Sequence, residues 1–113
     1  MTHSLPLLKG TLDLLILKAL SCAPTHGYGL ANWLEHHSDG DLVAEDSAVY
    51  QALHRMEGRG LVTAEWGVTE NNRKARYYSL TPGGWHHLES EAETWHRYAE
   101  SVSAILAVQI GDA

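Results

Sequence analysis

The sequence is poor in the residues on which several classes of protein depend. It has a single cysteine, Cys22, among 113 residues, which excludes a disulfide framework and a cysteine-rich metal site. Its most apolar run, Leu12 to Leu20, is too short to cross a bilayer and is interrupted by Asp13 and Lys18. We therefore expect a small cytoplasmic protein with one compact core and no membrane segment.

The patterns typical of enzymes and metal proteins are missing as well. No nucleophile–base pairing, glycine-rich phosphate loop or metal-ligand spacing is present. There are eight histidines, but the pairs His36–His37 and His86–His87 are adjacent in sequence. Adjacent side chains on a helix point about 100° apart, so they do not readily share one ion. We predict no catalytic residues, no metal site and no cofactor.

Positive charge is scarce and unevenly distributed. The chain has fourteen acidic and eight basic residues and a net charge of −6. Residues 54–80 nevertheless carry five basic and three acidic side chains, and both flanking regions are net negative. Within "NNRKARYYSLT" (71–81), Arg73, Lys74 and Arg76 lie close together. A polyanionic partner would be met in this region, although charged residues also commonly occupy a solvated turn.

The hydrophobic pattern predicts three helices, a hairpin and a long terminal helix. Thr11 is the expected N-cap of the first helix, Gly60 is placed to end the third, and Thr81 is placed to cap the fourth. On the second helix, Tyr28 and Leu34 lie on the expected buried face together with Ala31. The expected helices span 7–21, 25–38, 45–60 and roughly 82–109, and the expected strands span 61–66 and 75–80.

The third helix has a clear division between its two faces. Val49, Leu53 and Met56 recur at i, i+4 and i+7, so we expect them to face the core. Asp46 or Ser47 can cap the beginning of this helix. The outward face then carries small and polar side chains at its start and a cation further on, namely Ser47, Ala48, Gln51, His54 and Arg55.

The fourth helix carries a heptad seam sustained over three repeats. A terminal helix of this kind either packs on its own domain or pairs with a second copy, and we favour a homodimer. The seam residues, which we take as the dimer interface, are Trp85, Leu88, Ala92, Trp95, Ala99, Val102 and Leu106.

The order of three helices and a two-stranded hairpin is that of a winged helix. In such a fold the third helix enters the DNA major groove and the hairpin, or wing, contacts the flanking backbone or minor groove. We therefore predict a mainly α, α+β fold, a winged helix-turn-helix with a long C-terminal dimerisation helix. Residues 1–81 would form the DNA-binding domain and residues 82–113 the dimerisation helix.

Several segments together carry a family resemblance. They are "LLKGTLDLLILKALS", "HGYGLANWL", "VYQALHRMEGRGLV", "AEWG", "NNRKARYYSLTPGG" and the tail "LESEAETWHRY". Over roughly residues 5–106 the chain closely resembles the PadR family of bacterial transcriptional regulators, in its short subgroup with one C-terminal helix. The resemblance implies a homodimeric repressor that binds an inverted-repeat operator in double-stranded DNA and is released by a small molecule or another signal. The alternative is a winged-helix protein-interaction module that does not bind DNA.

The resemblance also implies roles for residues of the third helix. Ser47 and Gln51 match positions that meet base edges, and glutamine can pair with adenine through two hydrogen bonds. Arg55, one turn further, is expected at a phosphate. Tyr50 either contacts a phosphate or positions the helix, or is a half-buried core residue. Asp46 departs from the family pattern, which commonly has glycine or another neutral residue at this position. It places a negative charge where phosphates are expected.

Further roles are implied for the second helix, the wing and the seam. Arg73 and Lys74 match the wing tip and are expected to contact phosphates, whereas Arg76 lies in the strand, where a structural ion pair is equally open. Tyr28 either packs in the core or contacts the DNA backbone. Some relatives bind flat aromatic ligands between interface tryptophans. Trp95 resembles that position, so it contacts a small aromatic or hydrophobic effector or is only interface core.

Overall fold

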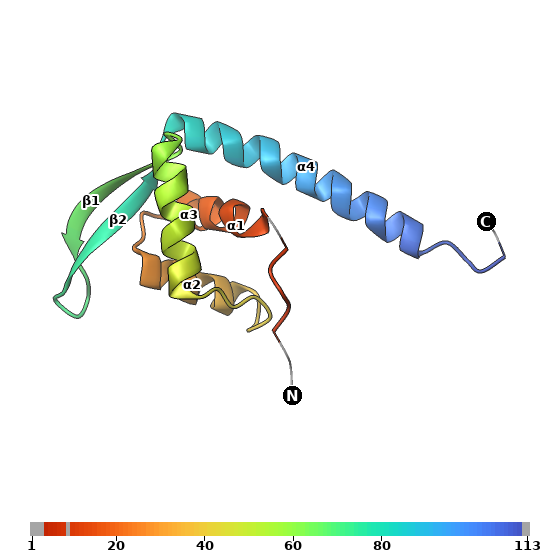
Figure 1. Cartoon of the computed structure of the whole chain (residues 1–113), viewed down its shortest axis with the longest axis horizontal. Coiled ribbons are helices and arrows are strands. Elements are labelled where there is room, and N and C mark those ends of the chain that lie inside the picture. The colour runs from red at the N-terminus through yellow and green to blue at the C-terminus, as the bar shows by residue number, and fades with distance from the viewer. Residues whose placement is uncertain (1–3, 9, 112–113) are drawn as a thin grey trace.

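The order of elements in the computed structural model agrees with the predicted winged helix (Figure 1). Three helices come first, a two-stranded antiparallel hairpin follows, and a long helix ends the chain. The structure describes residues 4–8 and 10–111, and within them the elements are α1 (Thr11–Cys22), α2 (Gly27–His37), α3 (Asp46–Gly58), β1 (Val62–Val68), β2 (Lys74–Leu80) and α4 (Pro82–Leu106).

The core lies where the first three helices meet the base of the hairpin. Val49, Leu53 and Met56 of α3 are fully buried there, as the helical spacing predicts. They pack in one cluster with apolar residues of α1, α2 and the hairpin. Burial of such side chains contributes roughly 1.5–3 kcal/mol each. The other members of this cluster include Ile16, Leu17, Leu30, Leu34, Val62, Tyr78 and Leu88.

The start of α1 differs from the prediction. The helix begins at Thr11, not at residue 7, and Lys9 of the expected range lies outside the described residues. Thr11 is therefore not the N-cap. That position belongs to Gly10, whose φ of 85° is a left-handed conformation that glycine adopts at little cost. The chain enters α1 through a turn that a threonine cap would not make.

The buried face of α2 is rotated from the one expected. Gly27, Leu30 and Leu34 are buried, whereas Tyr28 is 61% exposed. The reason is tertiary, because the ring of Tyr50 lies directly over Gly27. A Cβ atom at Gly27 would lie 2.7 Å from that ring. This contact turns the glycine inward and the neighbouring tyrosine outward.

The two ends of α3 agree with the prediction to different degrees. Its N-cap is Glu45 and makes no side-chain capping hydrogen bond, so neither Asp46 nor Ser47 caps the helix. At the other end Gly60 has a φ of 75°, and the N–H of the next residue, Leu61, donates to the carbonyl of Met56 at 2.9 Å. This is a glycine C-terminal motif of the kind expected, and it directs the chain into β1.

The hairpin is longer than predicted and forms a regular antiparallel pair. Trp66 lies opposite Arg76, and Val68 lies opposite Lys74. At the tip, residues 69–73 close a loop in which the Thr69 N–H donates to the Arg73 carbonyl at 2.8 Å. Asn72 has a φ of 61°, a left-handed conformation that asparagine tolerates, in agreement with its expected role in the turn.

The base of the hairpin is attached to the helical core. Thr25, in the connection between α1 and α2, exchanges two backbone hydrogen bonds with Tyr78 of β2, at 3.1 and 3.0 Å. A third short backbone segment therefore joins the sheet beside β2. The base is held by this segment on the β2 side, whereas the tip extends away from the helices (Figure 1).

The hydroxyl group of Thr81 links the turn between α3 and β1 to the start of α4. Thr81 is the N-cap of α4, as predicted, and its side-chain oxygen accepts from the Gly84 N–H at 2.9 Å. The same hydroxyl donates to the carbonyl of Gly60 at 2.7 Å. Gly84 is required because a Cβ atom there would lie 2.0 Å from the carbonyl oxygen of Leu61.

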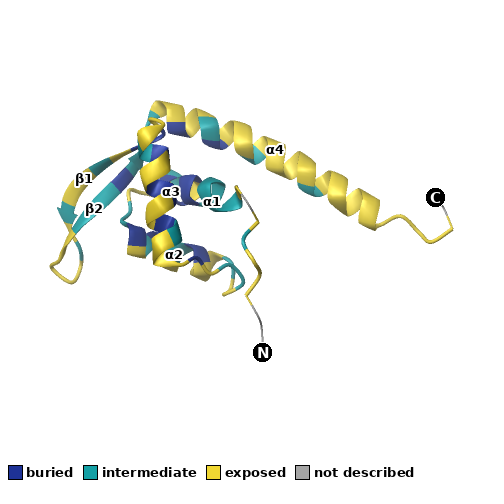
Figure 2. Ribbon diagram, in the orientation of Figure 1, coloured by how far each residue is buried: buried dark blue, intermediate teal, exposed yellow. Residues whose placement is uncertain are grey.

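Only the first part of α4 packs on the rest of the chain (Figure 2). Leu88 is buried, Ala92 and Ala99 are partly covered, and the remainder of the helix is largely exposed. The helix ends at Leu106 and not at residue 109. Among the described residues no helix combines the length and apolar character needed to cross a membrane.

Candidate nucleic-acid interface

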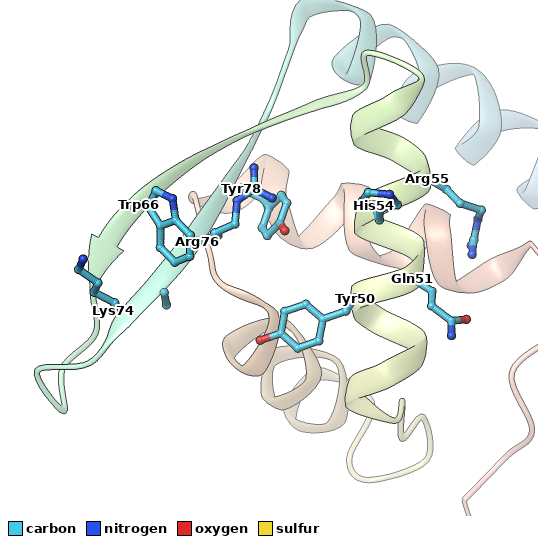
Figure 3. A pocket seen from close by; sticks show the side chains of 9 residues that line it. Tyr50, Gln51, His54, Arg55, Trp66, Lys74, Arg76 and Tyr78 are labelled. Atoms are coloured by element: carbon cyan, nitrogen blue, oxygen red, sulfur yellow. The ribbon is translucent and has the colours of Figure 1, made fainter.

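A hollow of about 790 Å³ lies between α3 and the wing. Figure 3 shows Tyr50 extending from α3 toward the wing, while Gln51 and Arg55 extend from the opposite side of the same helix. The wing supplies the second wall through side chains on its inner face. The lining residues are Tyr50, Gln51, His54, Arg55, Trp66, Lys74, Ala75, Arg76 and Tyr78.

A second hollow of about 540 Å³ continues toward the wing tip. Tyr50 and Lys74 line both hollows, so the two form one concave surface along α3 and the hairpin. Six of the seven predicted DNA-binding residues line it. The remaining one, Ser47, is exposed in the first turn of α3 and lines neither hollow. The second hollow is lined by Tyr28, Asp46, Tyr50, Thr69, Asn71, Arg73 and Lys74.

The two predicted tyrosines are both surface residues. Tyr50 has half of its surface exposed, and its ring rests on Gly27 at the start of α2. Tyr28 is also exposed, and its ring stacks on His26 with the ring centroids 6.5 Å apart. A core role for Tyr28 is therefore wrong. Both hydroxyl groups are positioned at the surface, where they can donate hydrogen bonds.

The four basic residues of the surface differ in how they are held. Arg55 Nη2 lies 2.9 Å from Asp13 Oδ1 on α1, and Arg76 Nη2 lies 3.0 Å from Glu57 Oε2 on α3. The ion pair left open for Arg76 is therefore present. Arg73 and Lys74 are exposed and make no ion pair within the described residues. The unpaired cations are thus at the wing tip, and the paired ones are nearer the core.

Tyr78 is a buried residue of the inner wing face. Burial raises the pKa of its phenol above the ordinary 10.0, and the positive charge of Arg76 partly offsets this rise. The guanidinium carbon of Arg76 lies 5.7 Å from the centre of the Tyr78 ring. This distance allows a cation–π contact, which together with Glu57 fixes Arg76 against the strand.

The sequence matches a known family over most of its length. The model of the "Transcriptional regulator PadR-like family" matches residues 16–90. The chain belongs to the PadR-like family. This is a family of transcriptional regulators and not of enzymes.

Solved structures of similar proteins support the assignment of this PadR-like chain. A PadR-like transcriptional regulator from Bacillus cereus is 26% identical, with a TM-score of 0.76 over 89% of this chain and 96% of the other. A PadR family transcriptional regulator from Eggerthella lenta is 29% identical, with a TM-score of 0.76 over 89% and 86%. A Streptococcus mutans protein is 22% identical with a TM-score of 0.80 over 98% and 97%, which shows a shared fold.

Trp66 and His54 line the larger hollow of this PadR-like protein, but neither was among the predicted site residues. Trp66 is 71% exposed and lines the larger hollow. Its position follows from strand alternation, because Val62 and Ala64 lie on the same face of β1 and face the core. This period-two signal could have placed Trp66 on the inner wall. His54 lies one turn after Tyr50 and Gln51 on the outward face of α3.

The predicted dimer seam of this PadR-like chain has two parts. Leu88 packs against the core of its own chain, whereas four large apolar residues of the seam, one before Leu88 and three after it, are exposed. These four are Trp85, Trp95, Val102 and Leu106.

Beside the buried end of the seam is a mainly apolar hollow of about 430 Å³ between α1 and α4. Trp95 forms part of its wall, and His96 meets the Trp95 ring edge-on at a centroid distance of 5.6 Å. The hollow is lined by Thr11, Leu14, Leu15, Lys18, Leu42, Leu88, Ala92, Trp95 and His96.

Proposed function

We propose that this PadR-like protein is a cytoplasmic homodimeric repressor that binds an inverted-repeat operator in double-stranded DNA. The observation that carries the proposal is the concave surface along α3 and the wing, which gathers six of the seven residues expected to bind DNA. The unpaired cations Arg73 and Lys74 stand at its outer end. A phosphate backbone is the partner that such a local cationic site fits, even on a chain of net charge −6.

The recognition helix in this proposal is α3. Ser47 and Gln51 are exposed near its N-terminal end, where they can reach base edges in the major groove. Arg55 lies one turn later and is exposed enough to exchange Asp13 for a phosphate oxygen. Specificity would come from Ser47 and Gln51, and affinity from the cations.

The wing and the two tyrosines supply contacts to the backbone. Arg73 and Lys74 bind phosphates beside the groove that α3 occupies. Tyr28 and Tyr50 flank the hollow next to the wing tip, and their hydroxyl groups donate to phosphate oxygens. None of these contacts reads a base, so together they set the register of α3 on the duplex.

Dimerisation through α4 completes the proposal. Residues 1–81 would form the DNA-binding domain and residues 82–113 the dimerisation segment, in which the exposed apolar seam of α4 (Pro82–Leu106) is covered by a second copy. Burial of Trp85, Trp95, Val102 and Leu106 would remove a large apolar surface from water. A two-fold dimer presents two copies of α3, which is why the operator should be an inverted repeat.

The effector site belongs beside Trp95. The hollow between α1 and α4 is mainly apolar and has an indole in its wall, which suits a small aromatic or hydrophobic molecule. Trp95 lies on the same helix as the proposed dimer seam, so a ligand there would alter how two copies pack. In the alternative, Trp95 is interface core and the releasing signal acts elsewhere.

The test is fluorescence anisotropy with a labelled duplex taken from the promoter upstream of the protein's own gene. Binding is measured at several salt concentrations for the wild type and for the Arg73→Ala/Lys74→Ala variant. We expect the wild type to bind this duplex more tightly than a scrambled one. The logarithmic salt slope of the double variant should be shallower by about 3.6, since the dimer loses two phosphate contacts from each copy and each contact contributes about 0.9.

The opposing outcome favours a protein-interaction module. The observation on its side is the pair of acidic residues Glu45 and Asp46, which stand exposed where α3 begins. If the protein binds no duplex at low salt, the repressor proposal is wrong. Tight binding with an unchanged salt slope in the double variant would show instead that the wing tip does not contact phosphates.

A further inference from the structure

Trp66 is a large aromatic side chain left exposed on the wall of a hollow. It is 71% exposed, although it lies on the inner face of the hairpin, the face that packs on the core further down. Its cross-strand neighbour Arg76 is directed to Glu57 and to the ring of Tyr78. Within residues 4–8 and 10–111, no aromatic ring or cation stacks on the Trp66 indole.

The surroundings of this indole indicate a charged partner. Lys74 and Arg76 lie beside it on β2, and Tyr50 and His54 stand on the opposite wall (Figure 3). An isolated exposed apolar residue is ordinary on a protein surface. An exposed tryptophan inside a concave wall with cations on one side and polar rings on the other resembles the centre of a binding surface, where tryptophan is enriched.

The position of the hollow identifies which part of a duplex would enter it. When α3 lies in the major groove and the wing lies over the adjacent minor groove, one sugar–phosphate strand separates the two grooves. That strand must pass between α3 and the wing. The larger hollow occupies this place, and Trp66 and Tyr50 project from its two walls.

We propose that Trp66 is a DNA-backbone contact whose indole face packs against the deoxyribose of this strand. The inference rests on the proposed function and adds a residue to it. The sugar offers an apolar surface, the flanking phosphates meet Lys74, and the indole N–H is free to donate to a phosphate oxygen. Because no base is read, Trp66 contributes equally to operator and to unrelated DNA. Because no charge is involved, its contribution does not depend on salt.

The experiment compares three variants of the full chain with the wild type. Trp66→Ala removes the indole, and Trp66→Phe keeps a smaller aromatic face. Thr63→Ala is the matched control, since Thr63 is an exposed residue on the opposite face of β1. Circular dichroism and thermal unfolding establish that each variant is folded. Anisotropy is then measured on the upstream promoter duplex and on a scrambled duplex, between about 50 and 200 mM salt.

Trp66→Ala weakens binding about tenfold, the loss typical of a well-packed interface residue. The loss is the same on both duplexes and at each salt concentration, and Trp66→Phe recovers part of it. Thr63→Ala binds as the wild type does. The fluorescence of Trp66 is obtained as the difference between the emission of the wild type and that of Trp66→Phe. We expect bound DNA to protect this fluorescence from quenching by acrylamide.

Other results would overturn the inference and identify which step failed. If Trp66→Ala binds normally while Arg73→Ala/Lys74→Ala binds weakly, the repressor proposal stands and the role of Trp66 is wrong. A loss confined to the promoter duplex would make Trp66 a base contact. Protection of the indole by a free aromatic molecule, but not by DNA, would make the hollow a ligand site. Absence of DNA binding by the wild type would overturn both proposals.

Discussion

Arg55 on α3 is held by Asp13 on α1, with Arg55 Nη2 2.9 Å from Asp13 Oδ1. The Arg55 side chain is 58% exposed, so this ion pair contributes only about 0.5 kcal/mol to stability. A contact this weak is easily exchanged for a phosphate. Asp13 is therefore a competitor for the arginine that α3 would offer to DNA.

The first prediction follows from this competition. Asp13→Asn should leave the free energy of unfolding within about 0.5 kcal/mol of the wild-type value and should tighten DNA binding several-fold. Anisotropy on the promoter duplex measures the gain. The control is Arg55→Gln, alone and combined with Asp13→Asn. In the combined variant most of the gain should vanish, because the arginine that was released is no longer present. If the combined variant gains as much DNA affinity as Asp13→Asn does alone, the effect comes from long-range charge and not from the release of Arg55.

The second prediction concerns the paired glycines at the start of α4. Gly84→Ala should destabilise the protein by about 3 kcal/mol, because the new Cβ would lie 2.0 Å from the Leu61 carbonyl oxygen, which is backbone and cannot move aside. Gly83→Ala is the matched control. Its Cβ would lie no closer than 3.6 Å to its neighbours, so we expect it to be neutral or stabilising by about 0.5 kcal/mol. Urea unfolding separates the two, and equal midpoints would contradict the close approach.

The third prediction tests Tyr50 without changing it. Gly27→Ala places a Cβ 2.7 Å from the Tyr50 ring, which is half exposed and can swing away. The stability change should stay below about 1 kcal/mol, since alanine also favours the helix. DNA affinity should fall by a factor similar to that of Tyr50→Phe or greater. Normal affinity in Gly27→Ala would mean that the observed position of the Tyr50 ring is not the one used on DNA.

A fourth prediction concerns alkaline pH. Burial raises the pKa of Tyr78 in the folded protein, so the unfolded chain releases this proton at lower pH than the folded one. The contribution to stability is complete below pH 10 and is lost as the pH rises through the raised pKa. The free energy of unfolding of the wild type should therefore fall more steeply above pH 10 than that of Tyr78→Phe. Parallel curves for the two proteins would contradict the assignment.

The fifth prediction addresses the seam of α4. Val102→Glu should raise the dimer dissociation constant by about 100-fold or more, because each copy would place a charge in the apolar seam. Ser101→Glu adds the same charge off the seam and should leave the dimer intact. Sedimentation velocity measures both, with circular dichroism as the check on folding. Equal dissociation constants would indicate that residues 82–113 associate through another face.

The sequence predicted those features that depend on local periodicity. The helical repeat of Val49, Leu53 and Met56 placed α3 correctly on the core, and Gly60 and Thr81 marked the turns into β1 and α4. These features depend on neighbours a few residues away, where spacing and backbone preference decide the outcome. The order of elements, and with it the winged helix, followed from them.

The side-chain contacts that the sequence did not predict have a different physical origin. Tyr28 is exposed because Tyr50, far along the chain, fills the space above Gly27. Arg55 is held by a partner 42 residues away and Arg76 by one 19 residues away, and no periodicity predicts such pairs. The hollow beside Trp66 likewise exists only once the hairpin folds back along α3. Side-chain partners of this kind are properties of the assembled fold.

The contrast between the base and the tip of the hairpin has a consequence for divergence. The hydrogen bonds between Thr25 and Tyr78 tie the base to the core, whereas most of the loop at 69–73 is exposed and its backbone hydrogen bonds are internal. Selection for folding therefore acts on the base and largely spares the tip. Changes in the length or charge of this loop can therefore alter the proposed contacts with DNA while the fold of the hairpin base is kept.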